Sequence, residues 1–214
     1  MIRKVLIGLG LLMLAAAPQM AATTAQAQAE TFDMKAALGE RSVGSKDAPV
    51  TILAFESLSC PHCAAFHAGA FPKIKKEYID TGKVRIVFKD FPLNAPAFWA
   101  SVMVRCMKPE QFLGMTEVLF EKQRVWLSAK SEKEFFDGLA QMGALAGLSR
   151  EEFDKCRNNK PFVEGVLALR NAAEKQYKIQ STPTFIIGDK RIEGAESFAA
   201  FKAVIDPLLE KAGK

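Results

Sequence analysis

The stretch Ser59-Cys60-Pro61-His62-Cys63 decides how the rest of the chain is organised. It stands between an apolar run typical of a buried strand, Thr51 to Phe55, and a run of helical character, Ala64 to His67. Two cysteines separated by two residues, where a strand gives way to a helix, form a pair that can open and close as a disulfide.

The position of Cys60 predicts its reactivity. It falls at the start of the helix, where unpaired backbone N–H groups and the positive end of the helix dipole stabilise a thiolate. Pro61 suits the first helical position, because its missing N–H would have no partner there, and His62 adds a donor or a positive charge near the sulfur. A stabilised thiolate makes the disulfide form oxidising, provided that solvent can reach Cys60. Cys63 is expected to be the less exposed of the pair.

Other chemistries of the same cysteines fit the sequence less well. A c-type haem site requires His directly after the second cysteine, and Ala64 stands there. A zinc site requires two further ligands at close spacing; His67 is one candidate, but Cys106 and Cys156 each stand alone. A purely structural disulfide across so tight a turn is uncommon. The pattern therefore favours redox chemistry, with no metal and no cofactor.

The first 29 residues have the pattern of a secretory signal peptide. Arg3 and Lys4 precede an apolar core from Val5 to Ala17, and two small-x-small cleavage sites follow at 25–27 and 27–29. The apolar core is too short for a comfortable membrane anchor. We expect the mature protein to begin near Glu30 and to work in an oxidising compartment, the periplasm.

Charge and length bound the remaining possibilities. The chain of 214 residues has a net charge of +5, and its Lys and Arg are interleaved with Asp and Glu along the expected helices. That pattern indicates solvated helix faces and predicts no nucleic-acid partner. About 185 residues remain after the leader, enough for one domain with a substantial core or a core domain with an insertion.

The order of expected elements predicts an α/β sandwich. Strands at 50–56 and 84–88 flank a helix from Cys60 to about Tyr78, bent near Phe71-Pro72, so the two strands should pair in parallel. Residues around 41–43 are a candidate edge strand. A strand after Pro183 turns at Gly188-Asp189 into a hairpin, and a last helix opens at Ser197.

Between these parts the pattern is helical throughout, with Ser131 and Ser149 as expected N-caps. The five expected helices lie at 95–107, 109–123, 132–146, 149–157 and 161–177. We divide the chain accordingly into a signal peptide (1–29), the first part of a core domain (30–93), an inserted helical subdomain (94–178) and the second part of the core domain (179–214).

Together these features resemble a DsbA-type thiol:disulfide oxidoreductase of the thioredoxin superfamily. The resemblance rests on Cys60 to Cys63, with the Cys-Pro-His-Cys sequence of DsbA oxidases, and on Thr182-Pro183. It covers essentially the whole mature chain and implies a thioredoxin fold with an inserted helical subdomain. It also implies that the Thr182–Pro183 bond is cis and lies against the redox pair, where Thr182 and Pro183 bind an extended substrate.

Two positions depart from the family pattern. Many relatives carry a buried acid six residues before the first cysteine, where this chain has Ala54. Glu56, on the same strand face, is a candidate proton shuttle for Cys63, although a solvated glutamate at the strand end fits equally. Thr182 stands where the best-known oxidases have Val and several isomerases have Thr. His67 is expected to be an ordinary helix-face residue.

Cys106 and Cys156 form the second candidate pair. Both lie on expected helices of the insertion, and in an exported protein with four cysteines the redox pair leaves these two to bond each other. Some DsbA relatives with a structural disulfide in the helical part look similar. The alternative is two buried free thiols.

The function that the resemblance implies is an exported oxidase that donates its Cys60–Cys63 disulfide to reduced or unfolded exported proteins. A quinone-coupled, DsbB-like membrane oxidase would then reoxidise the pair. A disulfide isomerase or reductase on the same fold, or a chaperone without enzymatic activity, remain alternatives. Isomerases of this type usually assemble through an extra N-terminal segment, and Glu30 to Pro49 leave little room for one, so we expect a monomer.

Overall fold

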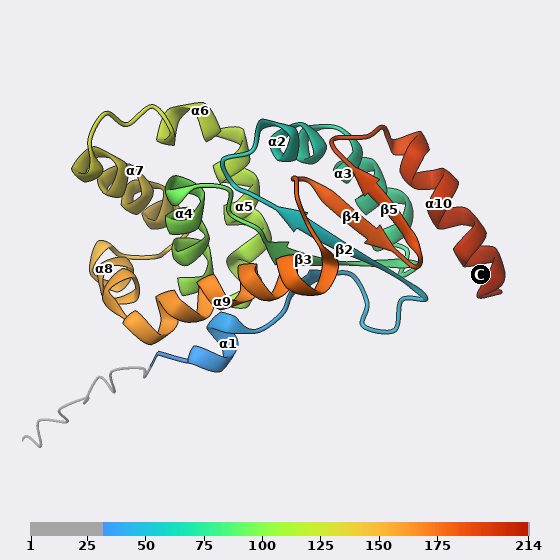
Figure 1. Ribbon diagram of the computed structural model, residues 1–214, viewed down its shortest axis with the longest axis horizontal. Helices are drawn as coiled ribbons and strands as arrows, with labels where there is room; N and C mark the ends of the chain where they lie inside the picture. The colour runs from blue at the N-terminus through green and yellow to red at the C-terminus, as the bar shows by residue number, and fades with distance from the viewer. Residues whose placement is uncertain (1–31, 214) are drawn as a thin grey trace, which may run out of the picture. The chain divides into compact units, whose positions relative to one another are not determined.

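Five strands within the described residues, 32–213, form one mixed sheet in the order β1-β3-β2-β4-β5 (Figure 1). The structure is a computed structural model. The central strands β2 (Val50–Glu56) and β3 (Val84–Asp90) run parallel, with Glu56 paired to Asp90 at their carboxyl ends. The remaining pairs are antiparallel and add β1 (Arg41–Val43), β4 (Thr184–Ile187) and β5 (Lys190–Glu193). The predicted parallel pair, edge strand and C-terminal hairpin are confirmed.

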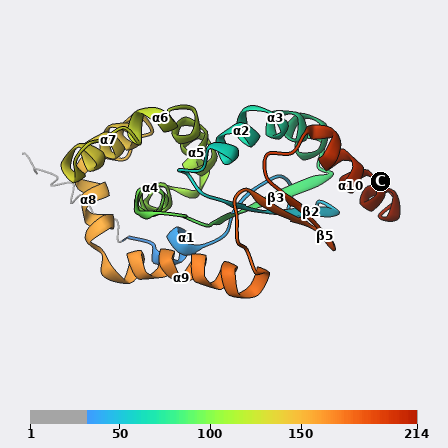
Figure 2. The same cartoon turned by 45° about the horizontal axis from the view of Figure 1, so that its top comes forward.

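Helices cover both faces of this sheet, as the alternating pattern predicted (Figures 1 and 2). On one face, Ile52 and Ala54 of β2 pack in a core with aromatic side chains such as Phe66 and Phe201. That side carries α2 (Pro61–Ala68), α3 (Ala70–Ile74), a π-helical turn (Lys75–Ile79) and α10 (Phe198–Lys211). On the opposite face, Phe55 of β2 packs with Ala173 of α9 (Lys160–Tyr177).

The helical block lies between β3 and β4, where the insertion was predicted. Ser131 caps α7 (Glu132–Leu145) and Ser149 caps α8 (Arg150–Asn158), where it forms the expected capping box with Glu152. The predicted helix at 109–123 is divided at Lys122 and begins with a 3₁₀ turn. Besides α9, the block contains α4 (Ala95–Cys106), the 3₁₀ turn (Pro109–Gln111), α5 (Phe112–Glu121), α6 (Gln123–Trp126), α7 (Glu132–Leu145) and α8 (Arg150–Asn158). From Asp33 onward the described chain forms one compact unit, so the division at 94 and 178 stays a prediction.

The helix that carries the cysteines breaks earlier than expected. The bend predicted near Phe71-Pro72 is wrong, because α2 ends at Ala68 and Gly69 separates it from α3. The ring of a proline clashes with the carbonyl of the residue four positions before it, which for Pro72 is Ala68. Pro72 itself sits in the first turn of α3, where an N–H is not needed, so the break moves upstream to the glycine.

A short helix that the sequence analysis did not predict precedes β1. It is α1 (Met34–Leu38), and two buried arginines hold its C-terminal carbonyl groups. Arg41 donates to Ala36 O at 2.8 Å and to Ala37 O at 3.3 Å. Arg105 donates to Ala37 O at 3.0 Å and also forms an ion pair with Asp90. These contacts tie the N-terminal segment to the sheet and to α4.

The predicted signal peptide, 1–29, lies outside the described residues. Within the described residues, no helix combines the length and the apolar character needed to cross a membrane.

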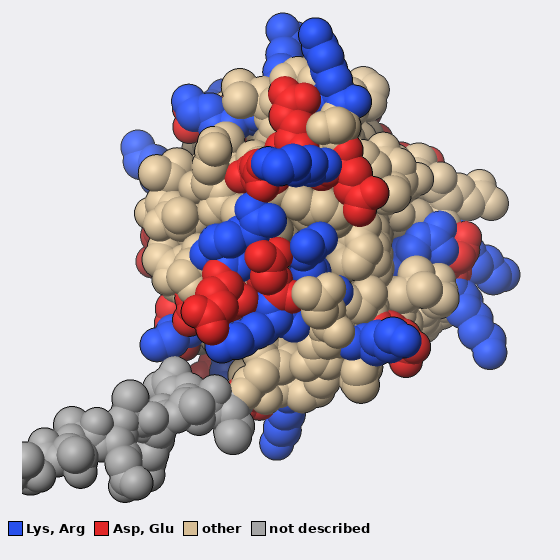
Figure 3. All heavy atoms as spheres, turned by 90° about the vertical axis from the view of Figure 1, so that its left-hand side faces the viewer, with Lys and Arg blue, Asp and Glu red and all other residues tan. Residues whose placement is uncertain are grey.

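Charged side chains of both signs alternate on the face shown in Figure 3. On α7 and α8, Arg150 pairs with both Asp137 and Asp154, and Arg157 also pairs with Asp154. These pairs neutralise one another locally, which agrees with the solvated helix faces expected from the sequence.

Candidate active site

The redox cysteines lie where β2 passes into α2, as predicted. A tight turn follows Glu56, closed by a hydrogen bond from Cys60 N to Ser57 O at 2.9 Å. Cys60 is the N-cap of α2 and Pro61 stands in its first turn. The sulfur of Cys60 therefore lies beside the unpaired N–H groups of the helix start.

Hydrogen bonds favour the charged form of Cys60. A hydrogen bond from the Cys63 thiol is the largest of the causes that lower the pKa of Cys60 to about 5, and the backbone N–H groups of Cys63 and His62 act in the same direction. Burial opposes them without cancelling them. The imidazole of His62 is exposed and makes no hydrogen bond to any described residue, so it is the backbone of His62 that contacts the sulfur here.

The environment of Cys63 favours its neutral thiol instead. Burial, followed by the hydrogen bond to Cys60 and the charge of Glu56, raises the pKa of Cys63 far above its usual range. Cys63 is 0% exposed and Cys60 is 5% exposed. Both cysteines are thus buried, Cys63 is the less exposed of the two as predicted, and the solvent contact of the pair is the small exposed part of Cys60.

The Thr182–Pro183 segment lies against the redox pair. Its peptide bond is cis. In its protonated form the Cys60 thiol donates to Thr182 O, 3.2 Å away, although 122 residues separate the two positions. β4 begins directly after Pro183 and pairs with β2, which places this segment beside the end of the strand that leads to Cys60. The structure therefore brings together the two anchors of the predicted site.

Glu56 and His67 form a buried hydrogen-bonded pair that the sequence analysis did not predict. Glu56 is 9% exposed, and its carboxylate oxygens lie 3.0 and 3.2 Å from His67 Nε2. Glu56 is thus not a solvated strand-end residue. The expectation that His67 is an ordinary helix-face residue is wrong, because its ring packs against Phe71, Phe88 and Phe120. The clue in the sequence was its spacing, one helical turn after Cys63.

Gln123 is a second residue that the sequence analysis missed. Its side-chain amide donates to Leu58 O at 2.8 Å and to Cys60 O at 3.0 Å. The first residue of α6 thereby fixes the backbone of the active-site turn to the helical block. Its 63-residue separation from Cys60 left no local signal in the sequence.

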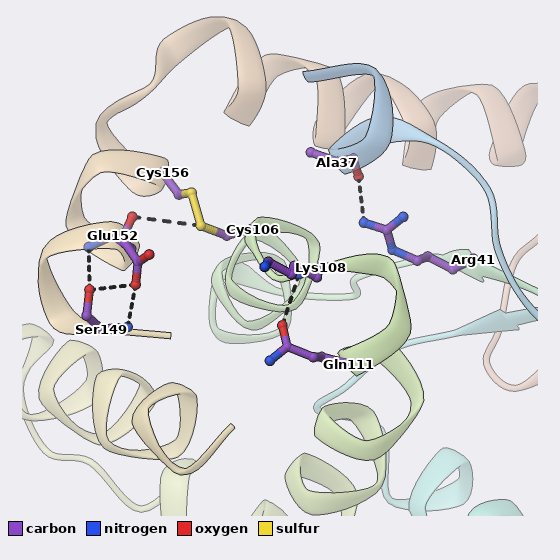
Figure 4. Close-up of a disulfide and its surroundings, with 8 residues drawn as sticks. All are labelled: Ala37, Arg41, Cys106, Lys108, Gln111, Ser149, Glu152 and Cys156. Carbon is purple, nitrogen blue, oxygen red and sulfur yellow. Dashed lines mark hydrogen bonds between the residues drawn. A yellow bond between two sulfur atoms is a disulfide. The ribbon is translucent and has the colours of Figure 1, made fainter. Parts of the chain in front are cut away.

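Cys106 and Cys156 form a disulfide between the end of α4 and α8 (Figure 4). Their Cα atoms are 6.0 Å apart, and the two positions are 50 residues apart in the sequence. The sulfur of Cys106 also lies 3.8 Å from Glu152 O, the backbone of the residue that completes the capping box of α8. The alternative of two free thiols does not apply in this structure.

Comparisons with known proteins agree with this site. The family model described as thioredoxin matches residues 36–207. Disulfide bond formation protein D of Bacillus subtilis is 31% identical over 181 residues, which cover 80% of this chain and 78% of that protein. A Rickettsia bellii protein, provisionally named a protein-disulfide oxidoreductase, is 28% identical over 86% of this chain and 71% of its own length. The chain spans only 60 to 62% of four other Rickettsia relatives.

Solved structures give the same result. The crystal structure of alpha-DsbA1 from Wolbachia pipientis matches with a TM-score of 0.74 and 28% identity, over 81% of this chain and 92% of that one. Oxidised BdbD from Bacillus subtilis matches with a TM-score of 0.71 and 26% identity, over 80% of this chain and 93% of that one. The predicted thioredoxin fold, with helical content beyond its core, is confirmed.

A thioredoxin fold with an acidic Cys60, a buried Cys63 and a cis-proline segment beside them defines a thiol:disulfide oxidoreductase. The chain belongs to the thioredoxin family, and within that superfamily it is of the DsbA type.

Proposed function

We propose that this protein is an exported thiol oxidase that donates its Cys60–Cys63 disulfide to newly exported proteins. The observation that carries the proposal is the difference between the two sulfurs, since the pKa of Cys60 is lowered to about 5 while that of Cys63 is raised. A disulfide whose reduced form is stabilised as a thiolate is a strong oxidant.

Each residue of the site has a proposed role in that reaction. A substrate thiolate attacks Cys60 of the oxidised form, the disulfide bond breaks, and Cys63 leaves with the bonding electron pair and takes up a proton. A second substrate thiolate then attacks the mixed disulfide and releases Cys60 as a thiolate, so two substrate thiols become a disulfide. Pro61 and His62 shape and polarise the helix start around the Cys60 sulfur, and Glu56 exchanges the proton with Cys63.

The segment at Thr182 and Pro183 is the proposed substrate-binding site. Cys60 is 5% exposed and contacts Thr182 O, so a substrate sulfur must approach along this segment. An extended peptide that pairs with its backbone would present a cysteine to the exposed edge of Cys60. This mode of binding depends on the backbone of the substrate, which suits an enzyme that accepts many unfolded chains.

Partners and location belong to the same proposal. The signal-peptide pattern of residues 1–29 supports export to the periplasm, where a quinone-coupled, DsbB-like membrane protein would reoxidise the pair. We propose a monomer that requires no cofactor and no metal and binds no nucleic acid. The elution volume of the mature protein in gel filtration tests the monomer, and a mass well above one chain contradicts it.

The competing function is a disulfide isomerase or reductase, which the threonine at 182 favours. Equilibrating the Cys60–Cys63 pair with glutathione separates the two. An oxidase should show an oxidising potential and a Cys60 that is alkylated in acidic solution, with a midpoint near the lowered pKa of about 5. A thioredoxin-like potential would indicate a reductase and overturn the proposal.

The variant Cys60→Ser tests the third alternative, a chaperone without enzymatic activity. An oxidase loses all turnover of a reduced, unfolded substrate with this variant. If the wild type never oxidises such a substrate, and both proteins suppress its aggregation equally, the site binds unfolded chains without redox chemistry.

A further inference from the structure

A pocket lies between α6 and α7 in the helical block. Its volume is about 570 Å³, within the range of roughly 300 to 1,000 Å³ that is typical of ligand-binding pockets. The lining includes Val125 and Trp126 of α6, Gly138 and Met142 of α7, and residues of the loop that joins the two helices. None of the residues proposed for the disulfide chemistry lies in this lining, so the pocket is separate from the redox site.

The helix α6 joins this pocket to the backbone that carries Cys60. Its first residue, Gln123, donates to Cys60 O at 3.0 Å, and Val125 and Trp126 follow two and three positions later. A helix advances about 1.5 Å per residue, so the pocket lining begins less than about 5 Å along the axis from Gln123. Figures 1 and 2 both place α6 between α7 and the start of α2. The pocket is thus continuous, through α6, with the redox site.

The charged side chains and the two serines of the lining already have partners. Asp137 pairs with Lys133 and Arg150, and Glu134 accepts a hydrogen bond from Lys130 N. The hydroxyls of the two serines bond to nearby backbone groups. What the pocket offers to a ligand is therefore mainly apolar surface.

That apolar surface is open to a ligand. Val125 is 60% exposed and Met142 is half-buried. Gly138 has no side chain, and a Cβ at this position would meet no atom within 4 Å. An apolar group that enters the pocket would bury Val125 and Met142 from water, which is favourable in proportion to the area covered.

We propose that this pocket binds an apolar side chain of the polypeptide whose cysteine reacts at Cys60. The inference rests on the proposed function, because it takes the substrate to be an unfolded protein. Unfolded chains expose the apolar side chains that folded proteins bury. An extended chain advances about 3.3 Å per residue, so a residue a few positions from the reacting cysteine can reach the pocket. Backbone pairing at Thr182 and Pro183 is independent of the substrate sequence, whereas the pocket favours cysteines that have an apolar residue nearby.

Peptide thiols of defined sequence test the proposal. The mature protein carries Cys63→Ser, with Cys60 in a mixed disulfide with thionitrobenzoate. A peptide thiolate attacks the Cys60 sulfur and forms the peptide–Cys60 disulfide, and thionitrobenzoate leaves with the bonding electron pair, which its absorbance records. The peptides contain Gly and Ser, one cysteine, and one Leu placed about two to six residues away. Ser replaces Leu in the control peptide.

We expect the Leu peptide with the best spacing to react about ten-fold faster than the control peptide, which corresponds to about 1.4 kcal/mol. Burial of one Leu side chain supplies that much. Equal rates of the Leu and control peptides at every spacing overturn the proposal.

Two glycines inside helices give a matched pair of variants. A Cβ at Gly138, or at Gly114 of α5, would meet open space, and of the two only Gly138 lines the pocket. Gly138→Gln fills part of the pocket with a polar side chain, and we expect it to reduce the advantage of the Leu peptide to about two-fold or less. Gly114→Gln should leave the advantage unchanged. Glutathione, which has no large apolar side chain, should react at the same rate with all three proteins.

An advantage of the Leu peptide that survives in Gly138→Gln overturns the proposal. So does a Gly138→Gln protein that also reacts more slowly with glutathione, because the substitution then acts on Cys60 and not on the pocket. The assay requires only thiol exchange at Cys60. A reductase-like potential would therefore overturn the proposed oxidase function and leave this result interpretable.

Photo-crosslinking locates the apolar side chain directly. Photoleucine, a diazirine analogue of leucine, replaces the Leu of the peptide, and irradiation of the peptide–Cys60 disulfide attaches it to the nearest residues of the protein. Crosslinks at Val125 or Met142 support the proposal. Crosslinks confined to α2 and to the segment at Thr182 and Pro183 overturn it, even if the Leu peptide reacts faster.

Discussion

At the start of α2, the sulfur of Cys60 accepts hydrogen bonds from the Cys63 thiol and from the first N–H groups of the helix, whereas Cys63 is fully buried in the hydrophobic core and faces the charge of Glu56. The two residues are three positions apart and have the same chemistry in isolation. Their environments assign different roles to them, because only the sulfur that is stabilised as an anion is a good leaving group and a good nucleophile near neutral pH.

This asymmetry predicts how the stability of the reduced protein depends on pH. Folding lowers the pKa of Cys60 from 9.0 to about 5, so the thiolate stabilises the reduced form fully above pH 9 and the stabilisation is lost as the pH falls through 5. At pH 7 the contribution is at most about 3 kcal/mol, and solvent screening reduces it. The measurement is the difference in unfolding temperature between reduced and oxidised protein from pH 4 to 9. A difference that does not change over this range contradicts the assignment.

The buried Glu56–His67 pair gives a second prediction for single residues. Glu56→Ala leaves His67 Nε2 without an acceptor, and we expect the free energy of unfolding to fall by about 2 kcal/mol. Glu56→Gln retains an acceptor and should cost about 1 kcal/mol or less. Urea unfolding of both variants makes the comparison. Equal losses would mean that the contact with His67 does not stabilise the fold.

The part of the site that could be predicted from the sequence consists of residues that are close together in the chain. Cys60, Pro61 and Cys63 are adjacent in the chain, and their spacing alone predicts a redox pair at a helix start. The contact with Thr182 was accessible only through family resemblance, because no local pattern relates positions 122 residues apart. The role of His67 was missed because a histidine on an apolar helix face has the same sequence pattern whether or not a strand presents a carboxylate to it.

At the scale of elements, short helices depend on tertiary contacts that the sequence does not display. α1 has five residues and is held by the guanidinium groups of Arg41 and Arg105. Isolated helices of this length are unstable, so a local pattern could not predict it. In contrast, the long helices α7, α8 and α9 were predicted closely, because each has an apolar face and a capping residue of its own.

The short helix α6 gives a testable link between the helical block and the active site. Gln123→Ala removes the donor for Leu58 O and Cys60 O, and we expect the free energy of unfolding to fall by about 2 kcal/mol. When the reduced protein reacts with dithionitrobenzoate, the first phase, in which Cys60 attacks and releases thionitrobenzoate, should also change, because the turn that carries Cys60 loses its anchor. Gln141→Ala, at an exposed position of α7, is the matched control and should stay within about 0.5 kcal/mol of the wild type. If the two variants behave alike, α6 does not fix the turn.

At the scale of the whole molecule, the Cys106–Cys156 disulfide joins the end of α4 to α8 and closes a loop that contains most of the helical block. The residue beside it, Arg105, pairs with Asp90 at the end of β3 and holds α1. The disulfide therefore restrains a helix that connects three parts of the fold. Cys156 is buried and Cys106 is half-buried, which limits the access of reductants to the bond.

Removal of this disulfide should reduce stability and leave the redox chemistry intact. The double variant Cys106→Ala with Cys156→Ala frees a loop that spans 50 positions, and the chain-entropy model then predicts a loss of up to about 4 kcal/mol in the free energy of unfolding. Urea denaturation measures this loss. Both proteins compared carry Cys60→Ser and Cys63→Ser, which excludes disulfide exchange with the active site, and the one that keeps Cys106 and Cys156 is oxidised. Both phases of the dithionitrobenzoate reaction, attack by Cys60 and then attack by Cys63 on the mixed disulfide, should be unchanged in the double variant with Cys60 and Cys63 present. A loss of unfolding free energy below about 1 kcal/mol would show that contacts such as Arg105–Asp90 hold α4 without the covalent bond. A changed rate of the Cys60 reaction would show that the helical block controls the redox site.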